Sequence, residues 1–205
     1  LQFEANENYF GTKPSIKNVT LQIIESTNTA KVALQKGEVD VTVVLPSDIK
    51  DLDTDSISTY AYSENRIGYL GLNSQTEQLK DVKVRQAIFY ALNKDEMNKA
   101  AYLDEKYYAT PYSFLPPANK FVSDDVEKYS TDDAKAKKLL AEAGVSDLKI
   151  NLAFTASDPA QSLQATLIQQ QLAKVGITVE LQGGDGTAIY TELRKADSTK
   201  YNMFL

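Results

Sequence analysis

The feature that most constrains the fold is an alternation of strand-like and helix-like segments, clearest over residues 148–181. Residues 148–154 form an apolar strand pattern, and residues 177–181 form another. Between them, residues 159–175 carry apolar side chains at helical spacing, and Gly176 follows where a glycine ends a helix. The inward side chains of this helix are predicted to be Leu163, Leu167, Ile168, Leu172 and Val175. A strand-helix-strand unit of this kind is right-handed and has parallel strands, so the sequence predicts an α/β fold.

The same alternation continues along the rest of the chain. Further strands are predicted at residues 19–24, 39–45, 57–62, 67–72 and 201–205. Further helices are predicted at residues 27–35, 81–92, 94–102, 131–143 and 187–196, with a helix start at residues 46–48. Ser47 and Asp81 are the expected caps of two of them, because their side chains can accept a bond from the first helical turn. Residues 107–122 are rich in proline and aromatic side chains and predict an irregular segment.

Two residue types that enzymes often use are missing, because the chain has no histidine and no cysteine. Ser-His-Asp and Cys-His catalytic systems, disulfides and thiolate metal sites are therefore excluded within this chain. The net charge of −6 argues against a nucleic-acid partner, because phosphate binding needs clustered Lys and Arg. We expect a binding protein rather than an enzyme, with no cofactor, no metal site and no catalytic residue.

Two local patterns raise other chemistry. Residues 183–186 read Gly-Gly-Asp-Gly before a helix, but they match neither nucleotide-binding glycine pattern, so a flexible turn is predicted. The adjacent acids Asp132 and Asp133 fall in the first turn of a helix, where capping and the helix dipole explain them. Arg85 lies on a helix with an apolar face and is predicted to have a structural role.

Six stretches stand in a characteristic order along the chain. They are residues 6–14 (NENYFGTKP), 36–40 (KGEVD), 69–73 (YLGLN), 81–94 (DVKVRQA, then ALNK), 135–144 (KAKKLLAEAG) and 171–177 (QLAKVGI). Together they resemble the extracytoplasmic solute-binding proteins of peptide and nickel ABC importers, oligopeptide-binding type (family 5). The sequence departs from that pattern at Phe10, where the family usually has Trp, and at Asn93-Lys94, where it usually has Asp-Arg.

The resemblance implies a periplasmic-binding-protein-like fold, type II, cluster C. In that fold two α/β lobes are joined by crossover strands and enclose the ligand. On this template, residues 1–66 form the C-terminal part of lobe I, and residues 67–73 form a hinge crossover strand. Residues 74–205 then form lobe II and end in the start of the return hinge strand. The template also implies a chain truncated at both ends.

The function that the resemblance implies is capture of oligopeptides between two lobes and delivery to a membrane permease. Tyr69, Thr155 and Arg194 match positions that line the cleft in oligopeptide binders. The expected partners are a peptide ligand and ABC permease subunits, and the expected oligomeric state is a monomer. The expected location is extracytoplasmic, either periplasmic or as a cell-surface lipoprotein.

Two other functions stay open at this point. A carboxylate-based glycoside hydrolase would need two inward acids about 5 to 10 Å apart in a cleft. A receptor for a peptide signal would bind its ligand in the same way but would have no role in transport.

Overall fold

The structure, a computed structural model, describes residues 1–62 and 67–205. The chain divides into two compact units, Leu1–Ser58 and Thr59–Leu205, and each is described by itself. Residues 63–66, at the end of the predicted lobe I segment, lie outside the described residues. The predicted lobe boundaries and the crossover segment at residues 67–73 stay predictions.

The first unit contains one short strand pair and two helices. Strands β1 (Gln2–Glu4) and β2 (Asn18–Thr20) pair in antiparallel fashion, and β2 covers only the start of the strand predicted at residues 19–24. Helix α1 (Thr27–Gln35) has the predicted bounds. A 3₁₀ turn (Pro46–Asp48) leads into helix α2 (Ile49–Leu52). The Lys31 Nζ lies 2.7 Å from Asp48 Oδ1, which joins α1 to this turn.

Three local predictions for this part of the chain are wrong. Residues 39–45 form no strand, and Val41 and Val43 are 88% and 71% exposed. A strand needs a hydrogen-bonded neighbour, and no segment among residues 1–62 and 67–205 pairs with this one. Residues 57–62 also form no strand, apart from an isolated bridge between Thr54 and Ile57. Ser47 does not cap a helix, because it lies inside the 3₁₀ turn, which has no side-chain cap.

The second unit is built on a four-stranded sheet with the order β3-β6-β4-β5. Its strands are β3 (Gly71–Leu72), β4 (Lys149–Thr155), β5 (Thr178–Gly184) and β6 (Met203–Phe204). Strand β4 is parallel to β5 and to β6, whereas β3 is antiparallel to β6. This arrangement confirms the predicted α/β fold with a largely parallel sheet. Strands β3 and β6 are shorter than the predicted segments 67–72 and 201–205.

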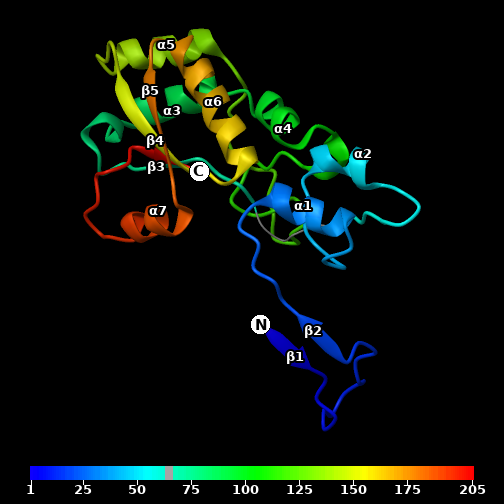
Figure 1. The fold of residues 1–205 in the computed structure, drawn as a ribbon. Helices are drawn as coiled ribbons and strands as arrows, with labels where there is room; N and C mark the ends of the chain where they lie inside the picture. Colours follow the sequence, from blue (N-terminus) through cyan, green and yellow to red (C-terminus); the bar gives the residue numbers. More distant parts are fainter. Residues whose placement is uncertain (63–66) are drawn as a thin grey trace. The chain divides into compact units, whose positions relative to one another are not determined.

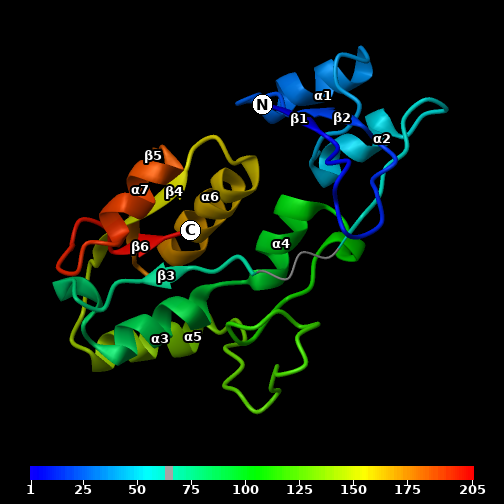
Figure 2. The same cartoon turned by 90° about the horizontal axis from the view of Figure 1, so that it is seen from below.

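Helices cover both faces of this sheet. Helix α6 (Pro159–Ala173) connects β4 to β5 and runs along them (Figure 1). Helices α3 (Val82–Ala91) and α5 (Asp133–Glu142) pack together, and α4 (Lys94–Tyr102) packs on α6. Helix α7 (Gly186–Leu193) lies across the sheet from α6 (Figure 2). The two faces follow from strand alternation, because Leu152 joins the core that holds α6 whereas Ala153 packs with α7.

Most helix predictions in this unit are confirmed. The bounds of α4 are those predicted, Asp81 caps α3 by accepting from the backbone N–H of Lys83, and residues 108–122 form no helix or strand. Arg85 has a structural contact, since its Nη1 donates to the carbonyl oxygens of Leu79 and Lys80. One prediction within α6 is wrong, because Leu163 is 48% exposed. Among the described residues, no helix combines the length and apolar character that crossing a bilayer requires.

Candidate functional site

The end of the sheet where β4, β5 and β6 finish, which we call the carboxyl edge, is the candidate binding site. The register aligns Thr155 with Gly184 and Ala153 with Phe204, so these three strands end at the same side. Strand β3 runs the opposite way and therefore begins there, with Gly71 beside Phe204. In open α/β sheets, ligands bind in the crevice outside the carboxyl ends of the parallel strands.

Thr155 is the last residue of β4 and lies at the carboxyl edge, next to the start of α7. Its backbone N–H donates to Gln161 Oε1 at 2.8 Å, and its carbonyl oxygen accepts from the N–H of Asp158 at 3.1 Å. A Cβ placed on Gly186, the first residue of α7, would lie 2.9 Å from Thr155 Oγ1. The glycine therefore allows the threonine hydroxyl to lie against the helix start.

Tyr69 also lies at this edge, two residues before Gly71 on the line of β3. Its side chain is 59% exposed, and its ring meets the ring of Phe204 edge-on at a centroid distance of 6.0 Å. Thr155 shares a face of the sheet with Phe204, because Phe204 pairs with Ala153, two residues before Thr155 on β4, and Tyr69 reaches that face through its ring contact with Phe204. Since β6 separates β3 from β4, the backbones of these two strands are roughly 10 Å apart at this edge.

Arg194 lies at the other end of α7 from Thr155. It is the C-cap of the helix and is exposed, and the structure shows no ion pair for it among the described residues. Eight helical residues rise roughly 12 Å, which separates Arg194 from the helix start that contacts Thr155. The structure thus brings Tyr69 and Thr155 to one edge and does not bring Arg194 to them.

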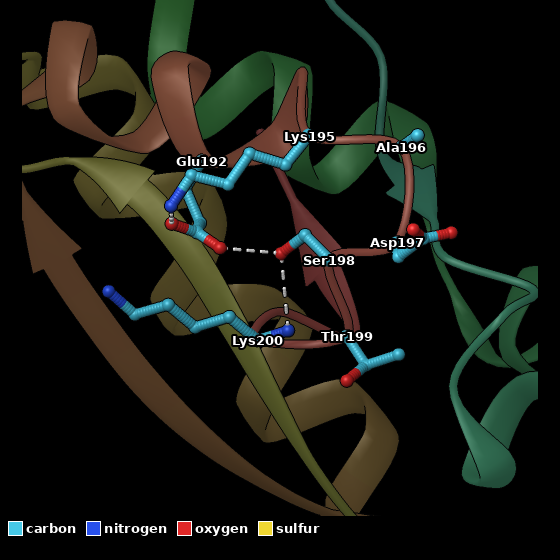
Figure 3. A pocket seen from close by; sticks show the side chains of 7 residues that line it. All are labelled: Glu192, Lys195, Ala196, Asp197, Ser198, Thr199 and Lys200. Atoms are coloured by element: carbon cyan, nitrogen blue, oxygen red, sulfur yellow. Dashed lines mark hydrogen bonds and ion pairs between the residues drawn. The ribbon is translucent and has the colours of Figure 1, made fainter.

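A hollow of about 540 Å³ is formed by the end of α7 and the loop from α7 to β6. Figure 3 shows its seven lining residues, which are Glu192, Lys195, Ala196, Asp197, Ser198, Thr199 and Lys200. The Glu192 carboxylate accepts from Lys195 Nζ at 2.6 Å and from Ser198 Oγ at 2.7 Å. These bonds hold the pKa of Glu192 below its usual value. Glu192 and Lys195 are thus paired with each other, whereas the described residues include no ion-pair partner for Asp197 or Lys200.

A second hollow, of about 610 Å³, lies between α4 and the segment that follows it. It contains Asp95, Glu96 and Glu105, together with Lys99 and Tyr108. Burial, together with the neighbouring carboxylates of Glu105 and Asp95, raises the pKa of the Tyr108 hydroxyl. Among residues 1–62 and 67–205, no three acidic side chains are placed to hold a metal ion together.

Comparison with known proteins decides the family. The family profile described as bacterial extracellular solute-binding proteins, family 5 Middle, matches residues 1–205. The chain belongs to this family. The family 5 chain is 35% identical over 188 residues to the dipeptide-binding protein of Escherichia coli, which covers 88% of the chain and 35% of that protein. It is 30% identical to heme-binding protein A of Haemophilus influenzae, over 86% of the chain and 33% of that protein.

The fold comparison agrees with the sequence comparison. The crystal structure of the ABC transporter substrate binding protein CtaP from Listeria monocytogenes matches 99% of the family 5 chain with a TM-score of 0.85 and 32% identity. The match covers 42% of that structure. The chain therefore spans about a third of the two curated relatives and less than half of the solved one.

Sequence reasoning missed two contributors to the carboxyl edge of this family 5 protein, Phe204 and Gly186. The strand predicted at residues 201–205 contains Phe204, but its position beside Tyr69 depends on the pairing of β6 with β3. Gly186 was assigned only to a flexible turn. A usable signal was present, because a strand that ends in glycine before a helix often marks a close approach to another group.

Proposed function

We propose that this chain is part of the substrate-binding component of an ABC importer and contributes one wall of a peptide site. The observation that carries the proposal is the shared position of Tyr69 and Thr155 on one face of the carboxyl edge. Tyrosine offers an apolar ring with one polar group, and the threonine hydroxyl adds a second polar group. Sites for small ligands combine apolar walls with a few such groups.

The mechanism we propose is capture by closure of two lobes. A ligand shifts a two-lobed protein toward the closed state only as far as it binds that state more tightly. Peptides offer main-chain groups to both walls, which gives affinity without a strict demand on side chains. The closed form would then dock as a monomer on a membrane permease. Docking would take place outside the cytoplasm, with the protein either in the periplasm or anchored to the cell surface as a lipoprotein.

The relatives support a peptide ligand and a binding rather than catalytic role. One relative is named for binding dipeptides and another for binding heme, so both names describe binding proteins. The acids nearest the carboxyl edge support the same view, because Asp158 and Asp185 cap helices α6 and α7. Asp158 Oδ1 accepts from two backbone N–H groups, so a hydrolytic role would have to displace these bonds.

Calorimetry on the full-length protein tests the assignment. The titrants are mixed peptides of two to nine residues, with hemin and nickel(II) histidine as separate titrants. Saturable peptide binding supports the proposal, and binding of hemin or the nickel complex in the absence of any peptide response overturns it. Peptide uptake is then measured in cells that lack the gene. Uptake should fall if the protein serves an importer and stay unchanged if it is a signal receptor.

A further inference from the structure

Phe204 is the residue at the carboxyl edge that the family assignment leaves without a role. Its ring is partly exposed and packs beside the small cluster of Ala153 and Ile189 on the α7 face of the sheet. It also meets the ring of Tyr69, with the two ring planes at 81°. The two rings therefore form one continuous aromatic surface on that face.

Gly71 is what allows this arrangement. A Cβ on Gly71 would collide with the Phe204 ring, so the ring lies directly on the backbone of β3. Larger residues at this position would push the ring away from β3 and toward solvent. The glycine allows the Phe204 ring to lie on the strand, and the neighbouring Tyr69 ring lies exposed at the carboxyl edge.

We propose that Phe204 is a specificity-determining residue that forms, with Tyr69, an aromatic wall for one apolar side chain of the bound peptide. The inference rests on the proposed function, since it assigns a subsite within the same carboxyl edge. Pairing puts Phe204 on the same face as Thr155, so a peptide held at Thr155 would pass over this wall.

The chemistry of the wall favours an apolar, and especially an aromatic, side chain. Aromatic rings prefer edge-to-face or offset contacts with other rings, and the tilt of Phe204 against Tyr69 leaves ring surface of both available. The closest acids at this edge, Asp158 and Asp185, are engaged as helix caps. A lysine side chain would therefore gain less here than a phenylalanine side chain.

The test measures side-chain preference in the full-length protein. Calorimetry compares tri-alanine with three tripeptides in which one alanine is replaced by phenylalanine. The wild-type protein should prefer one of these by about tenfold, the effect of burying one ring against others. In Phe204→Ala this preference should fall to about twofold or less, while the affinity for tri-alanine stays within about threefold.

A matched control uses the other phenylalanine of this edge. The ring of Phe154 lies over Gly183, but on the opposite face, in the core that holds α6. Phe154→Leu should keep the preference, whereas Phe204→Leu should lose the aromatic component of it. Thermal melts check that each variant is folded, and the leucine pair serves if Phe204→Ala is not.

The outcomes separate the two proposals. If the wild type binds tripeptides and Phe204→Ala or Phe204→Leu keeps the phenylalanine preference, the Phe204 assignment is wrong and the peptide function stands. A wild type that binds all four tripeptides equally also overturns the wall. If the wild type binds no peptide of any length, the proposed function itself fails, and the wall fails with it.

Discussion

Three asparagine side chains form hydrogen bonds to the backbone where β6 enters the sheet, in place of backbone-to-backbone bonds. Asn73 Nδ2 donates to the carbonyl oxygens of Ser198 and Tyr201, at 2.9 and 3.2 Å. Asn151 and Asn202 exchange two bonds, each backbone N–H donating to the other's Oδ1, at 2.9 and 2.7 Å. Strand β6 has only two residues, so these amides are a large share of what holds it in place.

Replacing one of these amides should cost much more than an ordinary surface substitution. Asn202 is 7% exposed, and Asn202→Ala leaves the N–H of Asn151 without its acceptor. An orphaned buried donor costs about 1–3 kcal/mol, so the free energy of unfolding should fall by that amount in urea titrations. Asn28→Ala, on the exposed surface of α1, is the matched control and should change it by less than about 0.5 kcal/mol. Equal effects of the two substitutions would contradict this account.

The pairing of Glu192 predicts a pH dependence. Bonds from Lys195 and Ser198 lower the pKa of Glu192 in the folded chain below 4.5, its value without them. The unfolded chain then takes up a proton at a higher pH than the folded one, so the bonds stabilise the folded chain above pH 4.5. This contribution is lost as the pH falls through the folded pKa. The gap in unfolding free energy between wild type and Glu192→Gln should therefore narrow from pH 6 to about pH 3. A gap that stays constant over this range would contradict the assignment.

At the scale of elements, Gln171 joins two helices through a buried amide. It lies on α6 and is 3% exposed. Its Oε1 accepts from the backbone N–H of Asn93, and its Nε2 donates to Glu96 Oε2, both at 2.9 Å. Because Asn93 is the N-cap of α4, this single side chain sets where α4 begins against α6.

Gln171→Leu should therefore loosen α4 more than it disturbs α6. Leucine fits an apolar core, but it leaves the N–H of Asn93 unpaired at a cost of about 1–3 kcal/mol. Hydrogen exchange should speed up in the first turn of α4, while β4 stays protected. Gln170→Leu, the exposed neighbour on the same helix, is the control and should leave exchange in α4 unchanged. Unchanged exchange in the Gln171 variant as well would show that α4 does not depend on this amide.

The same elements show what a sequence can predict and why. Helices α1 and α4 match their predicted bounds because their signals are local: periodic apolar residues, and for α1 a glycine in the left-handed region, Gly37, just after the end. The strand expected at residues 39–45 fails because strand formation needs a partner, and partners are not encoded locally. Gln171 was overlooked in α6 because its burial depends on Asn93, a residue far away in the sequence.

The candidate site also combines residues that the sequence predicts with a residue whose place depends on a distant strand partner. Tyr69 and Thr155 were predicted from a resemblance over short motifs, and the sheet places both at the carboxyl edge. Phe204 could not be predicted, because its place beside Tyr69 is a consequence of register between β3 and β6. The expected role of Arg194 stays a prediction. Because Arg194 lies at the C-terminal end of α7, a ligand that contacts both Thr155 and Arg194 would have to extend along this helix.

At the scale of the whole molecule, the question is how much of the binding site this chain contains. It spans 35% of the dipeptide-binding relative and 42% of the CtaP structure. In the proposed mechanism, the carboxyl edge supplies one face of the site, with Tyr69, Thr155 and Phe204, and capture by closure requires a second wall. A ligand that contacts one wall forgoes the contacts of the other but still loses its translational and rotational freedom on binding.

We therefore expect the isolated 205-residue chain to bind peptides more weakly than about 1 μM. The full-length protein should bind the same peptides at least about 100-fold more tightly, because each factor of ten needs only about 1.4 kcal/mol and a second wall offers several further contacts. Calorimetry on both proteins with one peptide measures the difference directly. If the isolated chain binds at 1 μM or tighter, the carboxyl edge of the second unit is sufficient as a site. Closure would then serve delivery to the permease rather than affinity. The Phe204 wall would contribute more to the binding free energy than its contact with a single peptide side chain.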